Sequence, residues 1–220
     1  AIQLNLLERE LEKQEGKKPK QTRLVCEQLQ KYFPNLNAAA RYYYKKEKYK
    51  EAMPYLRTCL DLPHTELGQS AHLSTRGDEQ NAIFYLISAF CTKQYGEVTR
   101  YDSLALSPVA TRPTIMKYLS LTAEAETDTT TYHRQLCEGW KAYPHDAFFF
   151  TRLADFYNRN KLFNQTLLLS AQQLKMDSTY TAAYMAQCVA HYEMQQYDSC
   201  IVSAQHALAC DSTYAEAHYY

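Results

Sequence analysis

Four residues, Asp-Ser-Thr-Tyr, stand at positions 177–180 and return unchanged at positions 211–214. The second copy follows the first after 34 residues, and each copy precedes an alanine-containing stretch, 181–184 and 215–218. An unchanged return at an offset of this size is typical of repeat arrays, in which each repeat is one small supersecondary unit. The sequence therefore predicts a repeat array.

The composition favours helices as the units of this array. The 220 residues include only 5 glycines and 7 prolines, whereas tyrosine occurs 20 times. Few glycines and prolines disfavour a fold rich in tight β-turns, and tyrosine suits half-buried surfaces because its ring is apolar and its tip polar. The formal net charge is zero, which gives the whole chain no electrostatic attraction to nucleic acid. No apolar run reaches the 18 residues that would predict a transmembrane helix.

The 34-residue period divides the chain into helix pairs. From Glu79 onward we expect first helices at 79–93, 113–126, 147–160 and 181–195, and second helices at 95–106, 128–142, 162–176 and 197–210. The predicted N-caps are Asp78, Asp128 and Asp146. The domain organisation that follows is two helix pairs in 1–62, an insertion in 63–78, four repeats in 79–214 and the start of a further repeat in 215–220.

The N-terminal part departs from this regular spacing. Within 1–62 we expect four helices. The first covers 2–14, the second ends at Phe33 before a break at Pro34, and the others cover 38–46 and 49–62. Residues 63–78 contain proline, glycine, serine and threonine, and predict an insertion of about a dozen residues with a short helix near 66–72.

The pattern resembles the tetratricopeptide repeat, a 34-residue helix–turn–helix unit with small residues at fixed places and a proline near its end. Residues 43–52 match the turn and the small residue of the second helix, 143–146 supply the proline, and 153–157 match the first helix. The resemblance implies an all-α, right-handed superhelical solenoid of antiparallel helix pairs. It also implies a concave face, lined by the first helices, that takes peptides or protein segments.

Small residues are required on physical grounds as well, because a bulky side chain at a close helix crossing would push the helices apart. Ala40 and Ala52 fit such a crossing, and Cys188 and Cys200 occupy the same two places in the last full repeat. The chain has seven cysteines, and an odd number argues against a complete disulfide framework. Burial as small apolar side chains is the favoured interpretation, and a Cys188–Cys200 bridge is the alternative hypothesis.

No motif predicts an enzyme, a metal site or a cofactor. Three His–Cys pairs at helical spacing share a helix face but lack further ligands: His133 and Cys137, Cys188 and His191, and His206 and Cys210. The five glycines are too scattered for a phosphate-binding loop. We expect a protein without catalytic activity, cofactor or metal.

The predicted partner-binding groove lies on the first helices. The helix at 79–93 has a core-facing set (Ala82, Tyr85, Leu86 and Ala89), yet its other face is apolar as well, so either the insertion or a partner should cover it. The predicted groove residues are Ile83, Phe84, Ile87, Phe90, Lys117, Tyr118, Leu121, Phe148, Arg152, Asp155 and Arg159. Leu121 stands where a carboxylate clamp of the family would need asparagine, so binding of chaperone tails is not predicted.

Basic residues gather near the N-terminus. Residues 1–50 hold 12 Lys/Arg and 6 Asp/Glu, and a possible contact for an acidic partner comprises Lys17, Lys18, Lys45, Lys46 and Lys48. A solvated edge is the other interpretation of these lysines.

The function expected from these features is a non-catalytic scaffold that binds another protein or a peptide on its concave face. The alternative is a sensory or regulatory repeat region whose output domain lies elsewhere in a larger protein. The Asp-Ser-Thr-Tyr joints resemble those of repeat proteins of bacterial cell envelopes. That resemblance favours the periplasm and leaves the cytoplasm open.

Overall fold

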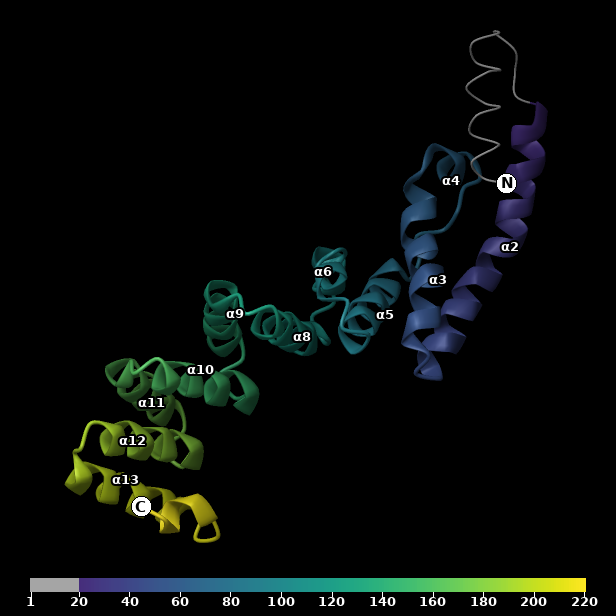
Figure 1. The fold of residues 1–220 in the computed structure, drawn as a ribbon. Coiled ribbons are helices and arrows are strands. Elements are labelled where there is room, and N and C mark those ends of the chain that lie inside the picture. The colour runs from purple at the N-terminus through teal and green to yellow at the C-terminus, as the bar shows by residue number, and fades with distance from the viewer. Residues whose placement is uncertain (1–19) are drawn as a thin grey trace. The chain divides into compact units, whose positions relative to one another are not determined.

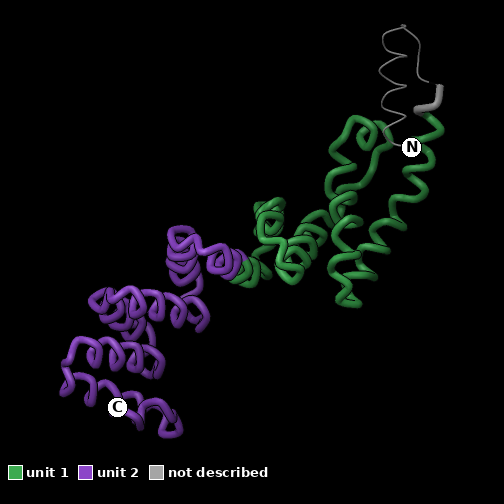
Figure 2. Tube along the Cα trace, viewed as in Figure 1, with its two compact units in different colours: residues 1–118 green, residues 119–220 purple. Residues whose placement is uncertain are grey.

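The computed structural model describes the backbone of residues 20–220 and the side chains of residues 23–220. Every regular element in this part of the chain is a helix, as predicted (Figure 1). The predicted helix at 2–14 lies outside the described residues. The elements are α2 (Lys20–Lys45), α3 (Tyr49–Asp61), η1 (Leu62–His64), α4 (Glu66–Ser70), α5 (Asp78–Cys91), α6 (Tyr95–Val98), α7 (Asp102–Ala105), α8 (Arg112–Ala125), α9 (Thr129–Ala142), α10 (Ala147–Arg159), α11 (Phe163–Met176), α12 (Thr181–Glu193), α13 (Tyr197–Cys210) and η2 (Ala215–His218). Two compact units divide the chain, residues 1–118 and 119–220 (Figure 2).

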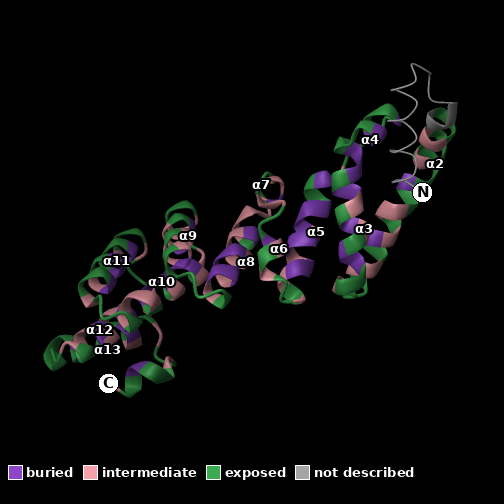
Figure 3. Ribbon diagram, turned by 45° about the horizontal axis from the view of Figure 1, so that its top comes forward, coloured by how far each residue is buried: buried purple, intermediate pink, exposed green. Residues whose placement is uncertain are grey.

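The predicted first and second helices of the second unit form within two residues of their expected ends. Figure 3 shows that exposed, intermediate and buried residues alternate along the helices. Cys188 and Cys200, on α12 and α13, are both buried free thiols whose Sγ atoms lie 3.2 Å apart. Burial, followed by the neighbouring thiol of Cys200, raises the pKa of Cys188 to about 12. The structure therefore has two small free thiols at this crossing, and the hypothesised bridge is not formed in it.

The Asp-Ser-Thr-Tyr stretches make two copies of one joint. In each, the aspartate follows the last helical residue with φ −143° and ψ 98°. The Oδ1 atom of Asp177 accepts hydrogen bonds from the backbone N–H of Thr179 at 3.0 Å and from its hydroxyl at 2.7 Å. Asp211 accepts the same pair from Thr213, at 2.9 and 2.7 Å. The repeated residues therefore fix the same turn between one helix pair and the next.

Close approach between α9 and α10 depends on a glycine. A Cβ atom placed on Gly139 would lie 2.2 Å from ring carbons of Phe149, which is fully buried. Within α9, Leu136 is fully buried too, and Tyr132 turns its ring edge toward Phe156 of α10. Gly139 thus lets the Phe149 ring occupy space that a side chain would fill.

The break predicted at Pro34 is wrong, because α2 runs through it as one helix of 26 residues. An internal proline costs about 3 kcal/mol, since it removes one backbone hydrogen bond and crowds the preceding turn. Packing on both sides of Pro34 outweighs this cost. Phe33 is buried against Cys59 and Leu62, and Ala40, further along α2, is fully buried.

The helix predicted at 95–106 forms as two short helices, α6 and α7. Tyr101 lies between them with φ −130°. Its hydroxyl donates a 2.6 Å hydrogen bond to Asp61 Oδ1 at the end of α3, and its ring meets Tyr85 edge-on at 5.0 Å. These contacts hold Tyr101 outside a helical conformation.

The three predicted N-caps have different outcomes. Asp128 accepts a hydrogen bond from the backbone of Thr131, and Asp146 accepts one from Phe148, so both cap their helices. The prediction for Asp78 is wrong: Gly77 occupies the cap position with φ +94°, and Asp78 is the first helical residue.

Gly139→Ala should destabilise the protein even though alanine is the better helix former. We expect a loss of about 1–3 kcal/mol of unfolding free energy, because the new methyl group overlaps the buried Phe149 ring. Gly96→Ala is the matched control, since no atom lies within 4 Å of its Cβ position, and it should leave stability equal or slightly higher. Urea denaturation followed by circular dichroism measures both. Equal stabilities for the two variants would contradict the close approach.

The two joint aspartates should make stability depend on pH. The threonine hydroxyl, followed by the threonine N–H, holds the pKa of Asp177 and of Asp211 below the usual value. A depressed folded-state pKa stabilises the fold above the unfolded pKa of about 4, and this contribution is lost as pH falls through the folded pKa. The double variant Asp177→Asn/Asp211→Asn should therefore be less stable than the wild type at pH 7, and this difference in stability should shrink as pH falls below about 4. Urea midpoints measured across this range test it, with Glu193→Gln as an exposed control; a gap that stays constant with pH would refute the role of the carboxylates.

Candidate functional site

A cleft of about 200 Å³ lies in the second unit between α10, α12 and η2. Its lining combines the small residues Ala154, Ala182 and Ala186 with the charged residues Asp155, Arg159 and Glu216. Asp155, Arg159 and Glu216 are exposed, while Ala154 and Ala186 are buried. The cleft is therefore a shallow apolar surface with charges of both signs at its edges.

The 34-residue register explains why the surface is hollow here. Ala182 and Ala186 of α12 stand at the positions that Phe148 and Arg152 occupy in α10. The later repeat thus has two methyl groups where the earlier one has an aromatic ring and a guanidinium group. Loss of these side chains leaves open space between successive first helices.

Asp155 and Arg159 are the predicted groove residues that line this cleft. Arg152 takes part in a different contact: its Nη1 lies 3.1 and 3.2 Å from the two carboxylate oxygens of Glu124 on α8. The Arg152 guanidinium carbon also lies 5.7 Å from the centre of the Phe148 ring. Leu121 is half-buried on α8.

The predicted groove residues of the first unit lie on α5 and α8. Ile83 is buried, and Ile87 and Lys117 are half-buried. Phe84 stacks on Tyr44 of α2 with ring centres 4.0 Å apart, and Phe90 meets Tyr118 edge-on at 5.1 Å. These six residues and the five of the second unit belong to different compact units, and one groove that includes all eleven stays a prediction.

Aromatic rings of α2 and α8 lie on Phe84 and Phe90, a cover that neither of the two alternatives, the insertion or a partner, predicted. Burial raises the pKa of Tyr44 to about 12, with smaller effects of Tyr49, Tyr118 and Cys91. The insertion packs instead on the α2–α3 pair. Gln30 donates a 2.8 Å hydrogen bond to the carbonyl of Ala71, and Leu73 packs against the cluster around Phe33.

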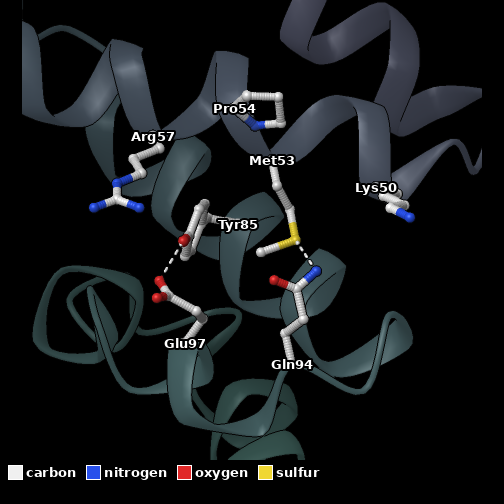
Figure 4. A pocket seen from close by; sticks show the side chains of 7 residues that line it. All are labelled: Lys50, Met53, Pro54, Arg57, Tyr85, Gln94 and Glu97. Carbon is white, nitrogen blue, oxygen red and sulfur yellow. Dashed lines mark hydrogen bonds between the residues drawn. The ribbon is translucent and has the colours of Figure 1, made fainter.

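A second cleft, of about 250 Å³, lies within the first unit (Figure 4). The hydroxyl of Tyr85 donates a 2.6 Å hydrogen bond to Glu97, and the side-chain amide of Gln94 donates one to the sulfur of Met53 at 3.4 Å. The Tyr85 hydroxyl holds the pKa of Glu97 below its usual value, and burial raises that of Tyr85. Sequence reasoning missed this cleft, because it depends on the turn between α5 and α6. Tyr85 and Glu97, and Gln94 and Met53, are thus paired with one another in this cleft, while Arg57 lies 3.5 Å from Asp61 outside it.

One predicted His–Cys pair gains a third member from another helix. The Nε2 atom of His133 lies 3.4 Å from Cys137 Sγ and 3.1 Å from the hydroxyl of Tyr157 on α10. Burial, followed by Cys137, raises the pKa of Tyr157 to about 12. Among the described residues, no group of three or more His, Cys, Asp or Glu side chains is placed to hold a metal ion.

The predicted basic contact is described in part. Lys45, Lys46 and Lys48 are exposed around the turn between α2 and α3, while Lys17 and Lys18 lie outside the described residues. Within residues 20–220, no helix is both long enough and apolar enough to cross a membrane.

Comparison with known proteins identifies the fold. No protein-family model and no curated protein matches the sequence. Structures of MamA, a tetratricopeptide-repeat protein, do match. One crystal structure of MamA has a TM-score of 0.60 at 9% identity and covers 84% of this chain and 94% of its own. Structures of MamA AMB-1 and MamA MSR-1 have TM-scores of 0.57 and 0.53 at 14% and 15% identity, and the matches cover 93% and 98% of those chains. At these identities the likeness concerns the fold, and the chain has the all-helical, tetratricopeptide-like fold that the resemblance implied.

Proposed function

We propose that this chain is a non-catalytic scaffold that binds an extended segment of another protein in the α10–α12 cleft. The observation that carries the proposal is the cleft itself, with its apolar floor and its charged edges. Recognition of a peptide uses contacts of this kind, since apolar pockets supply affinity and a few polar groups fix orientation. The tetratricopeptide-like fold supports a role in protein interaction.

The charges at the cleft favour a segment that carries both signs. Asp155 and Arg159 are one helical turn apart on α10, and Glu216 on η2 lies across the cleft from them. A segment with an apolar centre, one basic and one acidic side chain would match this surface. The exposed lysines at the α2–α3 turn provide a separate, basic contact for an acidic partner.

The cleft can be tested by filling it. A library of displayed random peptides is panned on the purified protein, and the affinities of the enriched peptides are measured for Ala182→Arg and for Ala171→Arg. Ala182 lines the cleft, whereas Ala171 is an exposed residue of α11 that does not. Both variants add the same charge and volume to a helix.

Peptides selected on the wild type should bind Ala182→Arg at least about tenfold more weakly, a loss of roughly 1.4 kcal/mol of binding free energy. Their affinity for Ala171→Arg should stay within about twofold of the wild type, a difference of less than roughly 0.5 kcal/mol. Equal effects of the two variants, or a panning experiment that enriches no peptide, would overturn the proposal.

A further inference from the structure

A third cleft, of about 440 Å³, lies where the segment after α4 passes beside α2 (Figure 1 shows both elements). Phe33, Asn37 and Arg41 line it from α2 at spacings of four residues, which places them on one helix face. Ser74 and Arg76 line it from the insertion. Its volume is within the range of about 300–1,000 Å³ that is usual for ligand sites.

The walls of this cleft are held by contacts on each side. Gln30 of α2 donates a hydrogen bond to the Ala71 carbonyl at 2.8 Å, and Leu73 packs on the cluster of Phe33, Cys59 and Leu62. Further along α2, Asn37 Oδ1 accepts a 2.8 Å hydrogen bond from the Nδ2 of Asn81 on α5. These contacts fix the insertion to α2 and fix α2 to α5, so the cleft is preorganised.

The two arginines lie close to each other in the fold. A Cβ atom on Gly77 would lie 3.1 Å from an Nη atom of Arg41, so the guanidinium group of Arg41 lies against the residue that follows Arg76. Neither arginine has an ion-pair partner among the described residues, and no carboxylate lines the cleft in that part of the chain. Two positive charges therefore share one site without compensation.

The other polar groups of the cleft are placed to donate as well. The Oδ1 atom of Asn37 already accepts from Asn81, which leaves its NH₂ group as the free side of the amide. Ser74 Oγ accepts a hydrogen bond from the backbone of Arg76 at 3.1 Å, and its own O–H is available to donate. A site of donors and cations selects anions, and guanidinium groups match carboxylates in bidentate geometry.

We propose that this cleft binds an acidic segment of a partner protein, with carboxylates of the segment paired to Arg41 and Arg76. An apolar side chain of the segment lies on the exposed Pro34 and Ala38. Lys45 follows Arg41 by four residues on α2, so an acidic segment that leaves the cleft along this helix meets the exposed lysines at the α2–α3 turn. The site does not use the α10–α12 cleft, and the two proposals are tested separately.

The test uses the full chain and fluorescence anisotropy with two labelled peptides, an alternating Glu-Leu octapeptide and its Gln-Leu counterpart. The pocket variant is Arg41→Gln/Arg76→Gln. The control variant is Arg23→Gln/Arg134→Gln, which removes the same charge from exposed arginines outside the cleft. Ser74→Asp is a second pocket variant that keeps both arginines and adds a competing carboxylate. Circular dichroism establishes that each variant is folded.

The Glu-Leu peptide should bind the wild type and lose at least about tenfold in affinity for both pocket variants, because charge-assisted hydrogen bonds are lost or competed for. Its affinity for the control variant should change by less than about twofold, since Arg23 and Arg134 lie outside the cleft in exposed ion pairs, which contribute little. Equal weakening in pocket and control variants, or equal binding of the Gln-Leu peptide, would overturn the proposal. So would wild-type-like binding by Ser74→Asp. Inorganic phosphate that binds the cleft as tightly as the peptide would assign it to phosphate groups and refute the acidic-segment ligand.

Discussion

The close crossing of neighbouring helices is the constraint on which the rest of the fold depends. At the α9–α10 contact the Phe149 ring fills the space beside Gly139, and at the α12–α13 contact two cysteine thiols meet at 3.2 Å. Helices that approach this closely cannot carry bulky residues at the contact. The sequence consequently has small residues at matching places of each unit, and larger apolar and aromatic side chains pack around them.

Much of this arrangement could be predicted because it is local. The 34-residue period and the Asp–Thr contacts of the joints act within a few residues, and the helices from α8 to α13 form as expected. The failures arise from contacts between distant residues. Pro34 lies within a continuous helix because Phe33 is buried against Cys59 and Leu62 and Ala40 is fully buried, and Tyr101 interrupts a helix because its hydroxyl binds Asp61. Local propensity contains no information about either contact.

The candidate site was predictable to a smaller extent. Periodicity placed Asp155 and Arg159 on the correct face of α10, and both line the cleft. It also placed Arg152 there, but Glu124 of α8 binds that side chain. Ala182 and Ala186, which open the cleft, were not predicted. Sequence patterns point to charged and large apolar residues, whereas here the small size of two residues creates the site. Superposing the repeats by their period would have exposed the exchange of Phe148 and Arg152 for Ala182 and Ala186.

A repeat array gives every unit a similar backbone, so chemical differences between its surfaces must arise where the repeat is altered. Two kinds of alteration occur in this chain. Substitution of large residues by Ala182 and Ala186 hollows the α10–α12 surface and leaves charges of both signs around it. Insertion of 63–78 instead brings Arg76 beside Arg41 and creates a site lined by donors. The substituted repeat would therefore select a partner with charges of both signs, and the insertion would select an acidic partner. The helical framework is the same at both sites.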